Sequence, residues 1–244
     1  MEKLKVKIII IGHADKIVDF QIIQKHNSNF FECSDLEHIS IIPNCQKDDG
    51  YLDNVYSKTE LTKLIENIQF DGICMAVMNY RFDDNFYMHR LDSNKLCISI
   101  AGIEEILLRK SISIENFILK NLYEAFIFYK IFNNLVNREV YNFVHHDTRG
   151  CVFDLNGDKN DIIYNTESPI ICEACQSKIN TKSVPKGFIK SIQNELEKIR
   201  KPWIKSIEIF IKKYPLVSVL TTFIFATVIN LVSNVIWEVI KKFC

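Results

Sequence analysis

Histidines and cysteines with the spacing of metal ligands lie close together in the second half of this 244-residue chain. A histidine pair precedes one cysteine, and a Cys-x-x-Cys motif follows about twenty residues later. Tetrahedral zinc prefers thiolates and imidazoles, and a Cys-x-x-Cys turn can direct two sulfurs to one ion. The pattern predicts a structural zinc site. Its candidate ligands are His145, His146, Cys151, Cys172 and Cys175.

Two other uses of these cysteines stay open at this point. They could be simple buried thiols, or Cys172 and Cys175 could form a redox pair. Thioredoxin-like pairs open a helix directly after a strand, and the intervening Glu173 and Ala174 do not lower a thiol pKa. A bound zinc would close a polar loop with little apolar content, so metal binding would supply free energy of folding. The zinc interpretation is therefore favoured.

Alternating strands and helices precede this segment and must position it. Short apolar, β-branched runs predict buried strands, and apolar residues at helical spacing predict helices between them. The expected strands are 6–11, 39–42, 73–78 and 95–100. The expected helices are 16–25, a helix from Ser57 or Thr59 to Ile68, 103–108 and 114–135. This alternation predicts a layered α/β domain.

The cysteine segment resembles the structural zinc site of archaemetzincins, which are metzincin zinc peptidases. In that family a helix with H-E-x-x-H-x-x-G-x-x-H is followed by C-x4-C, a spacer and C-x-x-C. Here His146 takes the place of the first cysteine, because four residues separate it from Cys151. The resemblance covers roughly residues 70–180. It implies a layered metzincin-like fold with a mixed sheet. The implied zinc ligands are His146, Cys151, Cys172 and Cys175.

The catalytic motif of that family is not carried over. In the best register Tyr123 and Ile127 replace both helix histidines, and Glu124 stands at the general-base position. His145 falls where the third ligand would follow, after an insertion. A catalytic zinc needs three protein ligands and an open fourth position, and the glutamate acts on metal-bound water. Glu124 and His145, the remaining catalytic candidates, cannot hold that ion alone, so Glu124 is expected to be an ordinary helix residue.

Other chemistry has little support in the sequence. A charged group at Asp83, Asp84, His89 and Arg90 follows the third expected strand, where α/β proteins often bind ligands, but loops also carry charges for solubility. Thirty Lys and Arg balance thirty Asp and Glu, so no net field attracts nucleic acid. With seven glycines in the chain, there is no glycine-rich phosphate loop.

The C-terminal part has a different pattern. Apolar residues recur at intervals of three and four along one helical stripe, among many lysines, and Pro202 is expected to break that helix. The stripe consists of Phe188, Ile192, Leu196, Ile199, Trp203, Ile207 and Phe210. Residues 216–237 then contain no charge over 22 residues. Such a helix is about 33 Å long, enough for a hydrocarbon core of about 30 Å. We expect a transmembrane anchor, with a buried core helix as the alternative.

The flanks of this apolar segment predict its orientation. Seven Lys or Arg lie between Lys190 and Lys213, and two follow at Lys241 and Lys242. This bias, with no signal peptide recognisable at the N-terminus, predicts a single-pass protein whose N-terminal domain is cytoplasmic. Asn230 and Asn234 lie one turn apart in the span. They could pair between two copies of the chain or be tolerated singly.

The sequence therefore predicts three parts. Residues 1–180 form a degenerate metzincin-like α/β domain with a zinc knuckle at 145–175, residues 181–213 a linker and basic amphipathic helix, and residues 214–240 the anchor. The expected function is a non-catalytic zinc-binding module at the cytoplasmic membrane face, with a binding, sensing or effector role. A divergent zinc-dependent peptidase or other hydrolase is the alternative.

Overall fold

The computed structural model of this chain divides into two compact units, Met1–Arg200 and Lys201–Cys244. The structure describes residues 2–43, 47–48, 54–199, 207, 210–212 and 214–243. Side chains are described at these positions except 47–48, 234–240 and 242–243.

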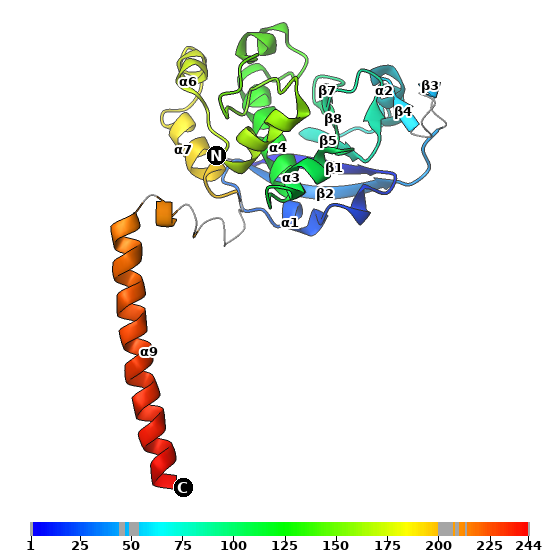
Figure 1. Cartoon of the computed structure of the whole chain (residues 1–244). Coiled ribbons are helices and arrows are strands. Elements are labelled where there is room, and N and C mark those ends of the chain that lie inside the picture. The colour runs from blue at the N-terminus through cyan, green and yellow to red at the C-terminus, as the bar shows by residue number, and fades with distance from the viewer. Residues whose placement is uncertain are drawn as a thin grey trace. The chain divides into compact units, whose positions relative to one another are not determined.

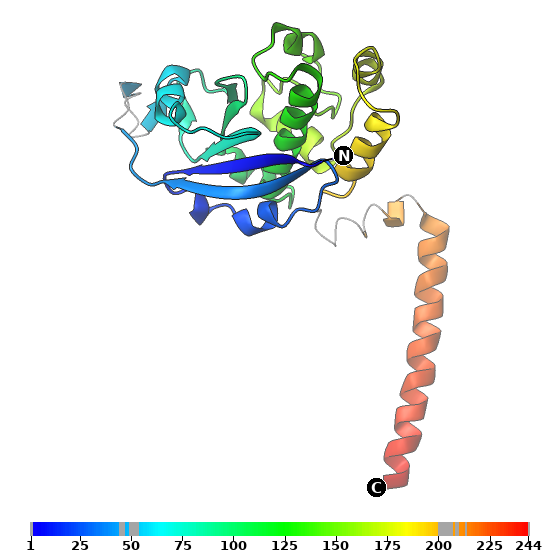
Figure 2. The ribbon, with the colours of Figure 1, turned by 180° about the vertical axis from the view of Figure 1, so that it is seen from behind.

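A five-stranded mixed sheet forms the centre of the first unit, with the order β2-β1-β5-β8-β7. The first four strands in this order are parallel, and β7 is an antiparallel edge strand on β8. Figure 2 shows β1 and β2 side by side along one edge of this sheet. The strands are β1 (Leu4–Ile11), β2 (Phe31–Ile39), β5 (Ile73–Met78), β7 (Met88–Arg90) and β8 (Lys95–Ser99). A second, three-stranded sheet contains β3 (Lys47–Asp48), β4 (Asn54–Tyr56) and β6 (Arg81–Phe82).

The central strand β5 is apolar along its whole length because both faces of the sheet are covered there. All six residues of β5 are buried, and they alternate between two core clusters. Met75 and Val77 belong to the larger cluster, which includes the long helix α4, whereas Cys74 and Ala76 face the smaller cluster beneath α2. The predicted α/β architecture with a mixed sheet is therefore confirmed.

The helix α4 (Ile114–Phe132) is the main element on the larger face (Figure 1). Ser113 caps its N-terminus by accepting a hydrogen bond from the Asn116 N–H, and it ends at Asn133 in the left-handed conformation. The smaller face is covered by α2 (Lys58–Ile65), which begins with a capping box formed by Ser57 and Glu60. The other helices are η1 (Ala14–Lys16), α1 (Phe20–Gln24), α3 (Ile103–Leu108), η2 (Arg138–Phe143), η3 (Lys159–Asp161), α5 (Ile162–Glu167), α6 (Glu173–Asn180), α7 (Phe188–Leu196) and α9 (Pro215–Phe243).

Two strands of the first unit differ from the predictions. The prediction of a strand at 39–42 is wrong, because β2 ends at Ile39. The outer face of β2 is exposed, and its polar residues obscure the alternation of apolar residues that would indicate a strand. The sequence also misses β7, which lies within the polar segment interpreted as a loop. An exposed edge strand needs few apolar side chains, because one edge and part of its faces meet water.

The first half of the apolar stripe belongs to the first unit. Phe188, Ile192, Leu196 and Ile199 are buried in the same core cluster as α4. Within residues 181–213, predicted to form a linker and a basic amphipathic helix, α7 therefore packs on the domain. Trp203 and Pro202 lie outside the described residues, and Ile207 and Phe210 are exposed.

The second unit contains α9. Its stretch Pro215–Ser233 is long and apolar enough to cross a membrane by length and composition, and 0% of it is buried by the rest of the structure.

Candidate metal centre

Four side chains from the predicted knuckle converge on one point in the first unit. They are His145, Cys151, Cys172 and Cys175, and their ligand atoms all lie within 4.8 Å of one another. The His145 Nε2 atom is 3.0 Å from the Cys175 Sγ and 3.2 Å from the Cys172 Sγ. Zinc bonds of about 2.3 Å to sulfur and about 2.0 Å to nitrogen require N–S separations of about 3.6 Å. The donor set is that of a structural zinc ion, and binding would move the imidazole and the two sulfurs apart by about half an ångström.

Backbone pairing brings these ligands together from three separate segments. Isolated β-bridges join His145 to Asp154 and Cys151 to Ile170. In the second bridge, the Val152 N–H donates to the Ile170 carbonyl at 2.8 Å. These short ladders place His145 and Cys151 beside the chain that leads into α6, so the geometry does not depend on a long strand.

The Cys-x-x-Cys motif spans the start of α6. Cys172 is the N-cap residue, with extended backbone, and Cys175 lies in the first turn. The Gln176 N–H donates to the Cys172 carbonyl at 2.9 Å, which fixes the turn between the two sulfurs. A helix N-terminus also favours negative charge on both thiolates.

Hydrogen bonds also stabilise negative charge at Cys151. The pKa of this thiol is lowered to about 6, chiefly by a hydrogen bond from Cys175 and further by backbone N–H groups that include that of Cys172. The pKa of Cys175 is raised, first by its hydrogen bond with Cys151 and then by burial. Cys33, outside the cluster, has its pKa raised to about 12 by burial alone. A divalent cation bound by the knuckle would stabilise the negative charge of all three thiolates.

The prediction of His146 as a ligand is corrected by this geometry. His145 is buried and faces the cysteines, whereas His146 is exposed and lines a separate cavity. Neighbouring side chains on extended backbone point in opposite directions. The bridge between His145 and Asp154 determines which of the two histidines faces inward. Five residues, and not four, separate the imidazole ligand from Cys151. The interpretation of His145 as a remnant catalytic ligand is corrected too.

The other predicted site residue, Glu124, lines a cavity of about 680 Å³ between β7 and α4. Its Oε1 atom accepts a hydrogen bond of 2.6 Å from the Arg90 guanidinium, which also lies over the Phe128 ring at 5.0 Å. The Lys120 ammonium, one turn before on α4 and fully buried, is 3.9 Å from the Glu124 Oε2 atom. Glu124 is therefore a buried ion-pair partner and not an ordinary surface residue.

The two residues that align with the helix histidines of the peptidase motif face the core. Tyr123 and Ile127 are completely buried, and the Tyr123 hydroxyl donates to the Glu195 carboxylate at 2.9 Å. His89 and Arg90 from the predicted charged group line the cavity with Glu124, and Asp84 contacts His89 at 3.1 Å. The structure thus gathers part of that group at the cavity.

Sequence reasoning missed two charged residues of this region, Lys120 and Asp154. Burial lowers the pKa of Lys120, and the charges of Glu124 and Asp154 oppose that shift. Asp154 accepts the N–H groups of Arg149 and Cys151 with one oxygen and lines the cavity. The one signal for Lys120 was a lysine on an otherwise apolar helical face, four residues before Glu124.

Comparisons with known proteins give one distant likeness. No protein family matches the sequence, and no curated protein matches it. Among solved structures, the chain is similar to the crystal structure of archaemetzincin from Methanopyrus kandleri, with 12% sequence identity and a TM-score of 0.46. The match covers 73% of this chain and 94% of that one. It is a distant resemblance in fold. At this identity and TM-score it shows neither a shared site nor a shared activity.

Proposed function

We propose that this protein is a non-catalytic module, stabilised by structural zinc and held at a membrane by its C-terminal helix. The observation that carries the non-catalytic part is the ion pair of Arg90 and Glu124, with Lys120 behind it, at the floor of the 680 Å³ cavity. Cations occupy the surroundings of the carboxylate, and they repel a metal ion. Within the described residues, the knuckle is the one group of metal-ligating side chains that converges.

Zinc in the knuckle would stabilise the part of the domain that covers α4. Phe143, Phe153 and Ile171 flank the ligands and belong to the same core cluster as that helix. The backbone bridges at His145 and Cys151 are isolated ones, so a metal ion that joins the four ligands would add to the order of this segment. Structural zinc supplies folding free energy in such segments.

The hydrogen bonds of α9 support the membrane part of the proposal. Hydroxyl groups in the span donate to carbonyls of the preceding turn: Thr221 to Val217 at 2.8 Å and Thr227 to Phe223 at 2.9 Å. Polar side chains need such internal partners in hydrocarbon, where water is absent. With the basic residues before the span, we infer that the first unit lies on the cytoplasmic side.

A second copy of the chain is the proposed partner of α9. Asn230 is exposed within the apolar stretch, and its amide carries both a donor and an acceptor, so two copies can satisfy each other. Such contacts contribute about 1 kcal/mol in bilayers. Asn230→Val should weaken dimerisation measured by energy transfer in vesicles about fivefold. Equal transfer would show that the amide is merely tolerated.

Metal stoichiometry tests the function. We expect one zinc per chain, lost in Cys172→Ser and retained in Glu124→Gln. The alternative of a zinc-dependent hydrolase has one supporting observation, since Glu124 and His146 line the same cavity. A second bound metal, or peptide hydrolysis abolished by Glu124→Gln, would establish that alternative and overturn the non-catalytic proposal.

A further inference from the structure

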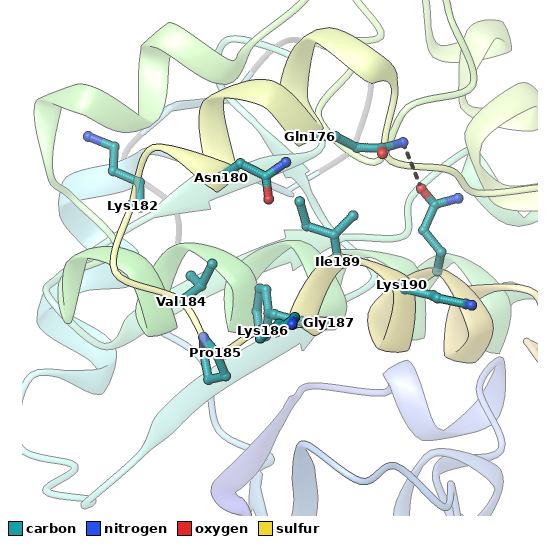
Figure 3. A pocket seen from close by; sticks show the side chains of 11 residues that line it. Gln176, Asn180, Lys182, Val184, Pro185, Lys186, Gly187, Ile189 and Lys190 are labelled. Atoms are coloured by element: carbon teal, nitrogen blue, oxygen red, sulfur yellow. Dashed lines mark hydrogen bonds between the residues drawn. The ribbon is translucent and has the colours of Figure 1, made fainter.

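A second cavity, of about 590 Å³, lies between α6 and α7 (Figure 3). Its polar lining side chains are three lysines and three amides, and no lining residue is acidic. In Figure 3, Val184 and Ile189 lie in the middle of the view with the lysines around them. The polar residues are Gln176, Asn180, Lys182, Lys186, Lys190 and Gln193.

The positive charge of this cavity is only partly compensated. Lys182 contacts the Glu139 carboxylate at 2.5 Å. Lys186 and Lys190 make no ion pair with any carboxylate in the described part of the chain. The two ammonium groups therefore leave a local excess of positive charge, although the whole chain is neutral. Such a cavity attracts a small anionic group.

The start of α7 adds hydrogen-bond donors to these charges. This nine-residue helix begins after Gly187, which has φ of 80° and provides no side-chain cap. The first-turn N–H groups of Ile189 and Lys190 donate to no acceptor among the described residues, and both residues line the cavity. Uncapped N–H groups at a helix N-terminus favour an anion, above all phosphate.

The amide wall of the cavity is continuous with the metal centre. Gln176, directly after Cys175, donates to the Gln193 side chain of α7 at 3.1 Å and to the Ile171 carbonyl at 2.7 Å. This contact joins α6 to α7 beside the cavity. The segment that carries Cys172 and Cys175 therefore positions one wall of the cavity.

We propose that this cavity binds the phosphate of an anionic lipid headgroup. The inference rests on the proposed membrane anchor, which selects lipid over free phosphate. Eighteen residues separate Leu196 from Pro215, so the chain between them reaches at most about 65 Å. If α9 spans a bilayer, this length allows α7 to reach the headgroups. Basic residues near an anionic bilayer each contribute about 1 kcal/mol, which is about fivefold in affinity.

The test uses the full chain in phosphatidylcholine vesicles, with and without phosphatidylglycerol. Flotation first shows whether the chain is anchored. The readouts are amide hydrogen exchange at Ile189 and acylation rates of Lys186 and Lys190. We expect phosphatidylglycerol to slow the exchange at Ile189 and the acylation of both lysines. Lys198, which is exposed and lies outside the cavity, is the control and should change less. In Lys186→Gln, protection of the Ile189 amide should need about fivefold more phosphatidylglycerol.

Three results would overturn the inference. Unchanged rates in a chain that floats would mean that no headgroup binds. Equal protection of Lys198, with no effect of Lys186→Gln, would mean diffuse attraction to the surface. Protection by inorganic phosphate or glycerophosphate in phosphatidylcholine vesicles, at concentrations as low as those of the lipid, would assign a free phosphate. A chain that fails to float would instead overturn the anchor, and the lipid assignment with it.

Discussion

The knuckle and the β7–α4 cavity both hold polar groups beside the long helix, but they balance charge in opposite ways. The knuckle brings three thiols and one imidazole together, with no cationic side chain among the ligands. Arg90 and Glu124 line the cavity, the fully buried Lys120 lies 3.9 Å from the Glu124 carboxylate, and Asp154 also acts on Lys120. The Arg149 guanidinium lies beside Cys172 at the edge of the knuckle, but the buried Cys151 and Cys175 still need a metal cation as thiolates, whereas the cavity already contains its own cations.

This difference separates a metal centre from a polar core. Buried charges are tolerated when they are paired and hydrogen-bonded, and removing one partner leaves the other without compensation. Clustered thiolates without a cation repel one another, and zinc removes that repulsion. Ligand type alone does not distinguish the two cases, since a histidine and carboxylates also line the cavity. The balance of charge within each region distinguishes the metal centre from the polar core.

Removing a knuckle ligand should have the largest effect. Cys172→Ser together with Cys175→Ser removes two of the four ligands, and structural zinc sites contribute about 10 kcal/mol or more of apparent binding free energy. We expect loss of zinc and a domain that is largely unfolded at 25 °C, measured by metal analysis and circular dichroism. Cys33→Ala is the control, because that buried thiol lies outside the cluster. A doubly substituted chain that melts like the unmodified protein would mean that no metal stabilises the fold.

Breaking the cavity ion pair should have the next largest effect. Glu124→Gln leaves Arg90 and Lys120 without their carboxylate, and breaking a buried pair costs about 3–5 kcal/mol of unfolding free energy. Zinc content should not change. The control Glu105→Gln, at an exposed position of α3, should stay within about 0.5 kcal/mol in urea denaturation. If Glu124→Gln released a metal ion, the contrast between the two regions would be wrong.

The sequence predicts these two regions to different degrees. Cysteines at ligand spacing indicate the knuckle, because its ligands come from short turns whose geometry follows from local sequence. The choice between His145 and His146 depends on a bridge to Asp154, and a shift of one residue reverses which side chain faces inward. The pairing of Arg90 with Glu124 joins an edge strand to a helix 34 residues later, so no local pattern could reveal it. The alternation of strands and helices could be predicted from apolar runs, whereas the short strand β7 could not.

A third polar region of α4 surrounds Tyr123. Its carboxylate belongs to Glu195 and, unlike that of Glu124, is stabilised mainly by neutral hydrogen-bond donors. Glu195 accepts hydrogen bonds from Ser28, Asn29 and the Tyr123 hydroxyl. His26 Nε2 lies 2.8 Å from that hydroxyl and must donate to it, because the hydroxyl proton goes to Glu195. Burial lowers the pKa of His26 from 6.5, and the charge of Glu195 opposes the shift.

This lowered pKa predicts the smallest effect, a loss of stability in acid. The unfolded chain binds a proton at His26 more readily than the folded one, so its contribution is present above pH 6.5 and is lost as the pH falls through 6.5 toward the folded value. The zinc ligands also take up protons in acid, so the measurement is the difference between His26→Gln and the unmodified chain, both saturated with zinc. We expect unfolding free energy to fall less steeply in His26→Gln between about pH 7 and about pH 5. Parallel slopes would mean that this imidazole is not coupled to folding, and that neutral donors alone stabilise Glu195.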